Sequence, residues 1–112
     1  MAFERIGSLE DLDDGAMHNR VTATGTPVLL VRLSGGALKA FQAYCPHQRF
    51  ELAHGCFDGT TLTCAGHCWQ FDARTGNGVE PTNCRLAEYP TRVDGTDIYV
   101  DVTNVEPLMA GH

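Results

Sequence analysis

The pattern of apolar and polar positions predicts short strands joined by tight turns. The most apolar segment is Pro27–Leu33, and its four consecutive apolar residues, Val28–Val31, predict a strand that is buried on both faces. Ala37–Tyr44 is predicted to be a second strand, because the intervening Ser34–Gly36 segment has the composition of a hairpin turn. The two segments are therefore expected to form an antiparallel pair.

A second hairpin is predicted near the end of the sequence, where Thr91–Val93 and Asp97–Val102 flank the turn residues Asp94–Thr96. Apolar residues alternate along the second of these strands, which places them on one face. The segment Ser8–Leu12 predicts one helical turn with Ser8 as its N-cap. Because no longer helical pattern is present, the sequence predicts a mostly β fold.

Length and composition indicate one folded domain that comprises residues 1–112. The apolar content of 43% and the charged content of 20% are ordinary for a globular protein. The strongest apolar run stops at Arg32, which is far short of a membrane span, and Met1–Arg5 lacks the regions of a signal peptide. We therefore expect a cytoplasmic protein without a membrane segment, in which a reducing compartment keeps the cysteines available for metal.

The net charge of −6 excludes nucleic acid as a partner, because neutralising phosphates requires clustered lysine and arginine. The excess of acidic residues favours basic protein partners. Acidic residues gather in two segments, one with Glu10, Asp11, Asp13 and Asp14 and the other with Asp94, Asp97, Asp101 and Glu106. Each group is equally consistent with a solvated surface that keeps the protein monomeric.

The candidate chemistry lies in two short segments that each contain one cysteine and one histidine. Cys45 and His47 form a C-x-H motif, and Cys64 and His67 form a C-x-x-H motif after 16 intervening residues. This is the ligand set of a Rieske [2Fe-2S] centre, in which two thiolates hold one iron and two imidazoles hold the other. Two cysteines and two histidines also suit zinc, but zinc fingers usually pair cysteine with cysteine and histidine with histidine. The alternation favours the two-iron cluster over zinc.

The surrounding residues resemble the small Rieske ferredoxins, with Gln48, Leu52, Gly55 and Gly59 in the first loop and Trp69, Phe71, Gly76 and Pro81 after the second. Within that family the sequence is most similar to the ferredoxin component of bacterial toluene-type diiron multicomponent monooxygenases. This similarity is carried by residues 45–48, 67–69 and 84–90, with further support from 3–6 and 97–100. Arg49 departs from the acidic residue that the family leads us to expect there.

The resemblance implies a Rieske-like fold of stacked antiparallel sheets, with one [2Fe-2S] cluster held at the tip of two loops between Cys45 and Phe71. Cys45 and Cys64 are expected to bind the inner iron, and His47 and His67 the outer iron. The resemblance further implies a monomeric electron carrier that is not itself an enzyme. Its expected partners are an NADH-dependent flavin reductase, which supplies single electrons, and the diiron hydroxylase of an aromatic or alkene monooxygenase system, which receives them.

Two alternatives remain open at this point. The ferredoxin of a ring-hydroxylating dioxygenase shares the same ligand motif and differs only in its oxygenase partner. A protein of a different class, a structural or regulatory module, would use the metal site to stabilise its fold or to sense redox state.

Residues near the motif predict a reduction potential at the low end of the Rieske range. Respiratory Rieske proteins have two loop cysteines at the positions of Phe50 and Gly66, and they have serine and tyrosine hydroxyls at the positions of Trp69 and Phe71. Trp69 is expected to donate its indole N–H elsewhere and Phe71 has no donor, so two of the hydrogen bonds that stabilise the reduced cluster are expected to be missing. The three other cysteines are predicted to be small buried or half-buried residues, and they are Cys56, Cys68 and Cys84.

Overall fold

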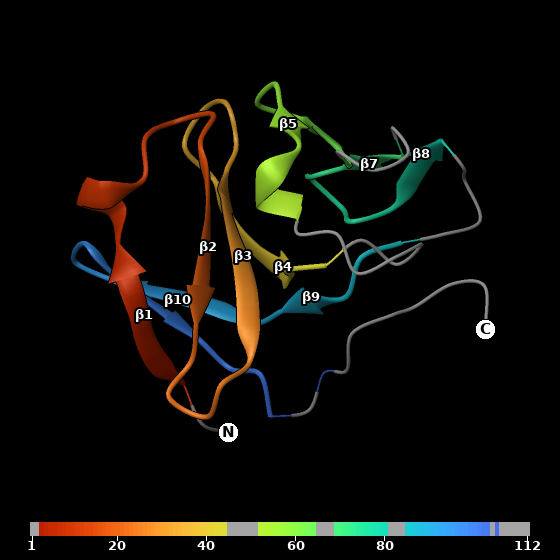
Figure 1. Cartoon of the computed structure of the whole chain (residues 1–112). Coiled ribbons are helices and arrows are strands. Elements are labelled where there is room, and N and C mark those ends of the chain that lie inside the picture. The colour runs from red at the N-terminus through yellow and green to blue at the C-terminus, as the bar shows by residue number, and fades with distance from the viewer. Residues whose placement is uncertain (1–2, 45–51, 65–68, 81–84, 104, 106–112) are drawn as a thin grey trace.

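The computed structural model describes residues 3–44, 52–64, 69–80, 85–103 and 105, and the regular elements of these residues are almost all antiparallel strands (Figure 1). The strands are β1 (Glu4–Ser8), β2 (Met17–Val21), β3 (Pro27–Arg32), β4 (Leu38–Gln42), β5 (Cys56–Phe57), β6 (Thr61–Thr63), β7 (Gln70–Asp72), β8 (Gly78–Glu80), β9 (Glu88–Tyr89), β10 (Thr91–Asp94) and β11 (Asp97–Val100). Two 3-10 turns, η1 (Leu9–Asp11) and η2 (Leu52–His54), complete the described elements.

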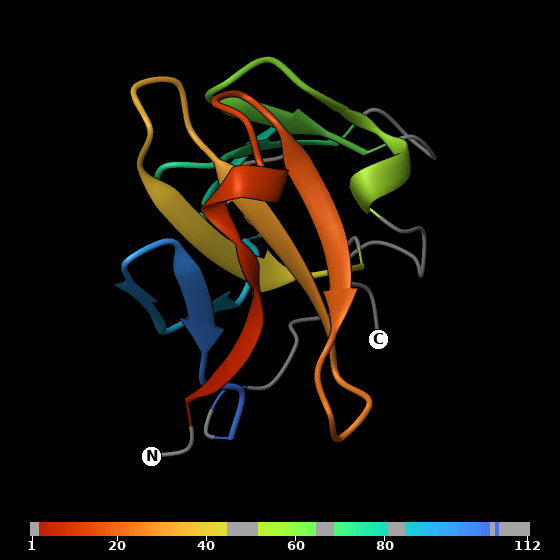
Figure 2. The same cartoon turned by 90° about the vertical axis from the view of Figure 1, so that its left-hand side faces the viewer.

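Three sheets share these strands. The central sheet has the order β2-β3-β4-β9, a second sheet has the order β5-β6-β7-β8, and a three-stranded sheet has the order β1-β11-β10. Figures 1 and 2 show β5, β7 and β8 toward the top of the molecule, and the β10–β11 pair lower, next to β1. The predicted fold class, mostly β with stacked antiparallel sheets, is confirmed.

Two groups of buried side chains lie on opposite faces of β3. The first core joins the central sheet to the β5–β8 sheet and consists of Leu29, Val31, Leu33, Phe41, Leu52, Leu62, Cys64, Phe71, Ala73 and Leu86. The second core joins the central sheet to the three-stranded sheet and consists of Leu12, Val28, Leu30, Ala40, Tyr89, Ile98 and Val100. Since alternate residues of a strand face opposite sides, the uninterrupted apolar run of β3 supplies both cores.

Burial along β3 confirms the prediction of a strand that is covered on both faces. Val28, Leu29 and Val31 are each 0% exposed, and Leu30 is 2% exposed. Burying an aliphatic side chain of this size contributes about 1.5–3 kcal/mol. The four side chains of this one strand therefore hold all three sheets together.

Both predicted hairpins are present. β3 and β4 pair antiparallel, and the turn between them closes where the Leu33 N–H donates to the Ala37 carbonyl at 2.8 Å. β10 and β11 pair with Asp94 opposite Asp97, as the turn composition predicts. Near the start, the Ser8 hydroxyl caps η1 by accepting a hydrogen bond from the Glu10 N–H at 3.2 Å.

The structure also tests the sequence-based description of the surface. Of the described residues, none belongs to a helix that is long and apolar enough to cross a bilayer. Glu10, Asp11, Asp13 and Asp14 are exposed, as expected of a solvated acidic segment. In the second acidic segment, however, Asp101 is only 4% exposed, and its carboxylate accepts hydrogen bonds from the Thr103 N–H and hydroxyl. The prediction of a second surface patch is therefore wrong for Asp101, and Glu106 lies outside the described residues.

Candidate metal centre

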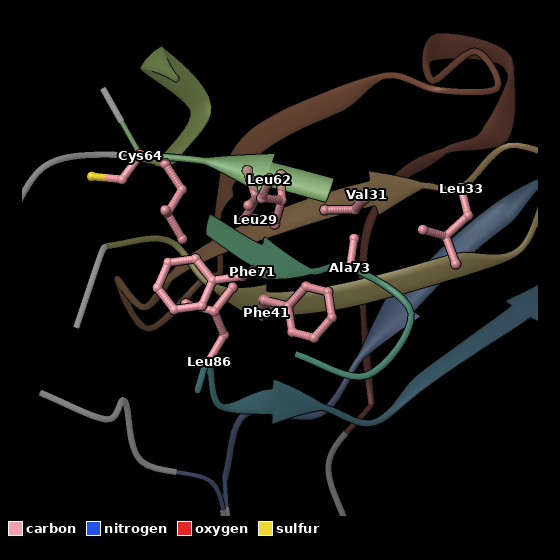
Figure 3. Close-up of a cluster of buried hydrophobic side chains, with 10 residues drawn as sticks. Leu29, Val31, Leu33, Phe41, Leu62, Cys64, Phe71, Ala73 and Leu86 are labelled. Atoms are coloured by element: carbon pink, nitrogen blue, oxygen red, sulfur yellow. The ribbon is translucent and has the colours of Figure 1, made fainter. Parts of the chain in front are cut away.

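Cys64 is the predicted ligand that lies within the described residues. It follows β6 directly, its thiol forms no disulfide, and the residue is only 1% exposed. Figure 3 shows its sulfur at the margin of the first core, pointing away from the labelled side chains of that core. Cys45, His47 and His67 lie outside the described residues, so the complete ligand set stays a prediction.

The second predicted ligand loop is closed at its base by strand pairing. β6 and β7 pair antiparallel with Thr63 opposite Gln70. At the next pair of residues toward the loop, the Cys64 N–H donates to the Trp69 carbonyl at 2.7 Å. Because Cys64 and Trp69 bracket residues 65–68, the two strands bring both ends of this loop together and place a buried thiol at its start.

The first predicted ligand loop is closed in the same manner. The Leu52 N–H donates to the Ala43 carbonyl at 2.8 Å, and these two residues bracket the segment that contains Cys45 and His47. Leu52 is 1% exposed and belongs to the first core together with Cys64. The structure therefore brings the bases of both predicted loops onto one apolar core, although they are far apart in the sequence.

A third segment is attached to the same core. The Leu86 N–H donates to the Gly76 carbonyl at 2.7 Å, and Asn77 and Arg85 form an isolated antiparallel bridge. These contacts bracket residues 81–84, which include Pro81 and lie outside the described residues. Leu86 packs in the first core, so the chain on the far side of this segment is anchored beside the two loop bases.

The aromatic residues near the second loop differ in exposure. Phe71 is 0% exposed and belongs to the first core, where its side chain offers no hydrogen-bond donor. Trp69 is half-buried and packs against that core. A buried, unpaired thiol at the start of a loop, set against an apolar core, fits the thiolate donor that an iron–sulfur cluster requires.

The prediction that Cys56 is buried or half-buried is wrong. Cys56 begins the two-residue strand β5 and is exposed, with its backbone paired opposite Thr63. A strand of two residues at the end of a sheet covers little surface, and the single-sequence pattern contains no signal for which of its faces is solvated. Cys68 and Cys84 lie outside the described residues.

The hairpin that carries Cys64 is stabilised by an aspartate in its turn. Asp58 lies between β5 and β6, and its Oδ1 accepts hydrogen bonds from the backbone N–H groups of Thr60 and Thr61 at 3.0 and 2.7 Å. These two N–H groups, Thr60 first, hold the pKa of Asp58 below its usual value, because they stabilise the charged form.

We expect Asp58→Asn to lower the midpoint of thermal unfolding at pH 7. A carboxyl whose pKa is lowered by folding contributes stability above its unfolded pKa of about 3.9, and this contribution is lost as the pH falls through the folded pKa. The difference in midpoint between wild type and Asp58→Asn should therefore shrink on acidification, as measured by circular dichroism. The control is Asp94→Asn, at an exposed position of the β10–β11 turn. An equal change for both variants at every pH would contradict this role of Asp58.

Comparison with known proteins agrees with the family that the cysteine and histidine motif predicts. Residues 3–90 match the family model of the Rieske [2Fe-2S] domain. The chain is 34% identical over 105 residues to the ferredoxin component of the alkene monooxygenase system of Xanthobacter autotrophicus, an alignment that covers 92% of this chain and 81% of that protein. It is 37% identical over 103 residues to the biphenyl dioxygenase ferredoxin subunit of a Pseudomonas species, covering 90% of this chain and 93% of that protein.

A solved structure extends the similarity to three dimensions. The ferredoxin of carbazole 1,9a-dioxygenase from Nocardioides aromaticivorans superposes with a TM-score of 0.78 at 29% identity. The superposition covers 89% of this chain and 97% of that chain, so it includes all three sheets and is not restricted to the neighbourhood of the loops.

Proposed function

This chain belongs to the Rieske [2Fe-2S] domain family, and we propose that Cys45, His47, Cys64 and His67 are the ligands of its cluster. It is an electron-transfer ferredoxin component of an oxygenase system, as its relatives are. The observation that carries the ligand proposal is the position of Cys64, a buried and unpaired thiol at the closed base of the β6–β7 loop. We propose that residues 1–112 form one such domain with one cluster.

In this proposal the two cysteines bind the inner iron and the two histidines bind the outer iron. The cluster, when bound, accepts one electron and passes it on. The described residues provide its support: the first core shields the Cys64 side of the site from water, and the Ala43–Leu52 and Cys64–Trp69 hydrogen bonds fix where the two loops begin and end. Two neutral imidazoles in place of two thiolates make the site less negative, which favours the reduced state.

For the partners, we propose an NADH-dependent flavin reductase as electron donor and the diiron hydroxylase of an aromatic or alkene monooxygenase as acceptor. The relative from Xanthobacter autotrophicus, a component of an alkene monooxygenase system, supports this assignment. A ring-hydroxylating dioxygenase is the second candidate acceptor, supported by the 37% identity to a biphenyl dioxygenase ferredoxin subunit. In both cases we propose that this chain carries electrons and does not itself catalyse the oxygenation.

A reconstitution experiment separates the two acceptors. The purified protein is mixed with a flavin reductase and NADH, and then with either a diiron hydroxylase or the terminal oxygenase of a dioxygenase. Hydroxylated product that depends on this chain and appears with the diiron hydroxylase alone supports the monooxygenase proposal. Product that appears only with the terminal oxygenase of the dioxygenase would instead support the ring-hydroxylating dioxygenase as the acceptor. If neither acceptor receives electrons, the result would support a structural or regulatory module.

The reduction potential is expected to lie toward the lower end of the Rieske range of about −150 to +300 mV. The physical reason is that Phe71 occupies, fully buried, the position where respiratory Rieske proteins have a tyrosine hydroxyl. Without this donor, the extra negative charge of the reduced state is less stabilised. A redox titration monitored by absorbance measures the potential, and a value above roughly +100 mV would contradict the proposed role between a flavin reductase and an oxygenase.

We propose the cytoplasm as the location and a monomer as the working state. The exposed thiol of Cys56 is unpaired, which fits a reducing compartment. The exposed acidic segment 10–14 supports a solvated monomer, since like charges on separate copies repel each other. Figure 1 places this segment, coloured red-orange after β1, on the far side of the β2–β3 hairpin from β7 and β8, so it is removed from the strands that flank the second ligand loop.

A further inference from the structure

The side chain of Gln42 lies at the point where β4 leads into the first ligand loop. Gln42 is the last residue of β4, and it is only 1% exposed although it carries a polar amide. A buried amide is stable only when its donor and acceptor groups are hydrogen-bonded. Both groups of Gln42 have backbone partners, and those partners belong to two different segments of the site.

The amide oxygen of Gln42 replaces a backbone group at the end of the β4–β9 pair. Regular pairing between these strands ends with Phe41 opposite Glu88. One residue further, the Gln42 N–H donates to the Ala87 carbonyl at 2.9 Å, while the Ala87 N–H donates to the Gln42 Oε1 at 2.8 Å. The side chain therefore accepts the hydrogen bond from Ala87 and extends the attachment of the two segments beyond the sheet.

The amide nitrogen of Gln42 is directed to the residue that precedes Cys45. The Gln42 Nε2 donates to the Tyr44 carbonyl at 2.8 Å. The neighbouring carbonyl, of Ala43, accepts from the Leu52 N–H and closes the loop. Because a peptide unit is planar, holding the Tyr44 carbonyl oxygen restricts the orientation of the whole peptide plane that leads into Cys45.

We propose that Gln42 is a positioning residue for the cluster. Through one buried amide it joins the entry to the first ligand loop, at Tyr44, to Ala87, which follows the third segment of the site. Ala87 is itself anchored, since the adjacent Leu86 donates to Gly76 and packs in the first core. The Gln42 amide thus fixes the position of the start of the first loop relative to the segment that follows residues 81–84. This inference rests on the proposed function, because it assumes that Cys45 is a cluster ligand.

The test compares Gln42→Met and Gln42→Glu with a matched core variant. Methionine has a similar size but has no donor and only a weak acceptor, whereas ionised glutamate keeps an acceptor for the Ala87 N–H and loses the donor to the Tyr44 carbonyl. The control is Val100→Ala, which removes packing from the second core at a residue that is 0% exposed and lies in the three-stranded sheet. All four proteins are purified with their cluster, and three properties are measured: the reduction potential, the electron paramagnetic resonance spectrum, and the rate of cluster loss to an iron chelator.

We expect both Gln42 variants to show a shifted reduction potential and altered resonance positions in the spectrum. Gln42→Met should also lose its cluster about tenfold faster than wild type, because an unmade buried hydrogen bond is costly. Val100→Ala should unfold at a lower temperature and keep the wild-type spectrum and potential. A Gln42→Met protein with a lower unfolding temperature but an unchanged spectrum, potential and rate of loss would overturn the inference and leave a structural role only. If Gln42→Met does not fold, the same measurements on Gln42→Glu decide.

The outcome for wild type separates this inference from the proposed function. A wild-type protein without iron and sulfide would overturn both. A wild-type protein with a normal cluster, together with unchanged Gln42 variants, would overturn the positioning role alone.

Discussion

Replacing Cys64 with alanine is expected to yield a protein that contains neither iron nor acid-labile sulfide. The thiol of Cys64 is buried at the start of the β6–β7 loop, and alanine has no group that can bind iron. Because metal binding in such sites is coupled to folding, we also expect a lower midpoint of thermal unfolding. Iron and sulfide are measured chemically on the purified protein, and unfolding is followed by circular dichroism.

The matched control is Cys56→Ala. Cys56 is the other free cysteine among the described residues, and its backbone pairs with the residue next to Cys64, but its side chain is exposed. This variant should keep the iron and sulfide content of wild type. A full cluster content in Cys64→Ala would show that the ligand assignment is wrong, whereas loss in both variants would point to damage of the hairpin and not to a missing ligand.

Replacing Gly76 with alanine is expected to cause a large loss of stability while it leaves the proposed ligands in place. The backbone at Gly76 has a φ of +82°, and an added Cβ would lie 3.0 Å from both the Leu86 carbonyl oxygen and the Phe41 Cε1. The left-handed conformation alone costs a non-glycine residue about 1–2 kcal/mol. Crowding in a packed core adds about 1–3 kcal/mol. The hydrogen bond from the Leu86 N–H to the Gly76 carbonyl holds Leu86 beside the bases of the two ligand loops. Because Gly76→Ala disturbs this bond, we also expect the variant to lose its cluster faster on heating.

The variant Gly15→Ala separates the cost of the left-handed backbone conformation from the cost of crowding in the core. Gly15 has nearly the same backbone conformation, with a φ of +77°, but an added Cβ would meet nothing within 4 Å. Each kcal/mol shifts the unfolding midpoint by about 4–8 °C in a domain of roughly this size. Gly76→Ala should therefore unfold at least about 4 °C below Gly15→Ala, as measured by circular dichroism. Equal midpoints would mean that the Gly76–Leu86 contact is not tightly packed.

The sequence was sufficient to predict the parts of the fold that depend on local signals. Four consecutive apolar residues in β3, glycine-containing turns in the two predicted hairpins, and a serine before η1 each act within a few residues, so each can be recognised without the rest of the chain. The motif that contains Cys64 is likewise local. Its spacing correctly predicts the Rieske family to which the chain belongs.

Other features depend on contacts between distant residues and could not be predicted from the sequence. The strands β5–β8 have two or three residues each, too few to show a period, and they form a sheet because their pairing places Leu62 and Phe71 in the first core. Asp101 is buried where its backbone N–H donates to the carbonyl of Pro90, which belongs to the segment between β9 and β10. The bonds of Gln42 to Ala87 span 45 residues, and within β4 a single glutamine gives no sign of such a partner.

The most direct test of the central claim is the iron, sulfide and zinc content of the freshly isolated protein, combined with the electron paramagnetic resonance spectrum of its reduced form. If Cys45, His47, Cys64 and His67 hold a Rieske cluster, the protein contains about two iron and two sulfide per chain and shows the resonance of a cluster with mixed sulfur and nitrogen ligands. One zinc per chain without sulfide, or neither iron nor sulfide, would contradict the account.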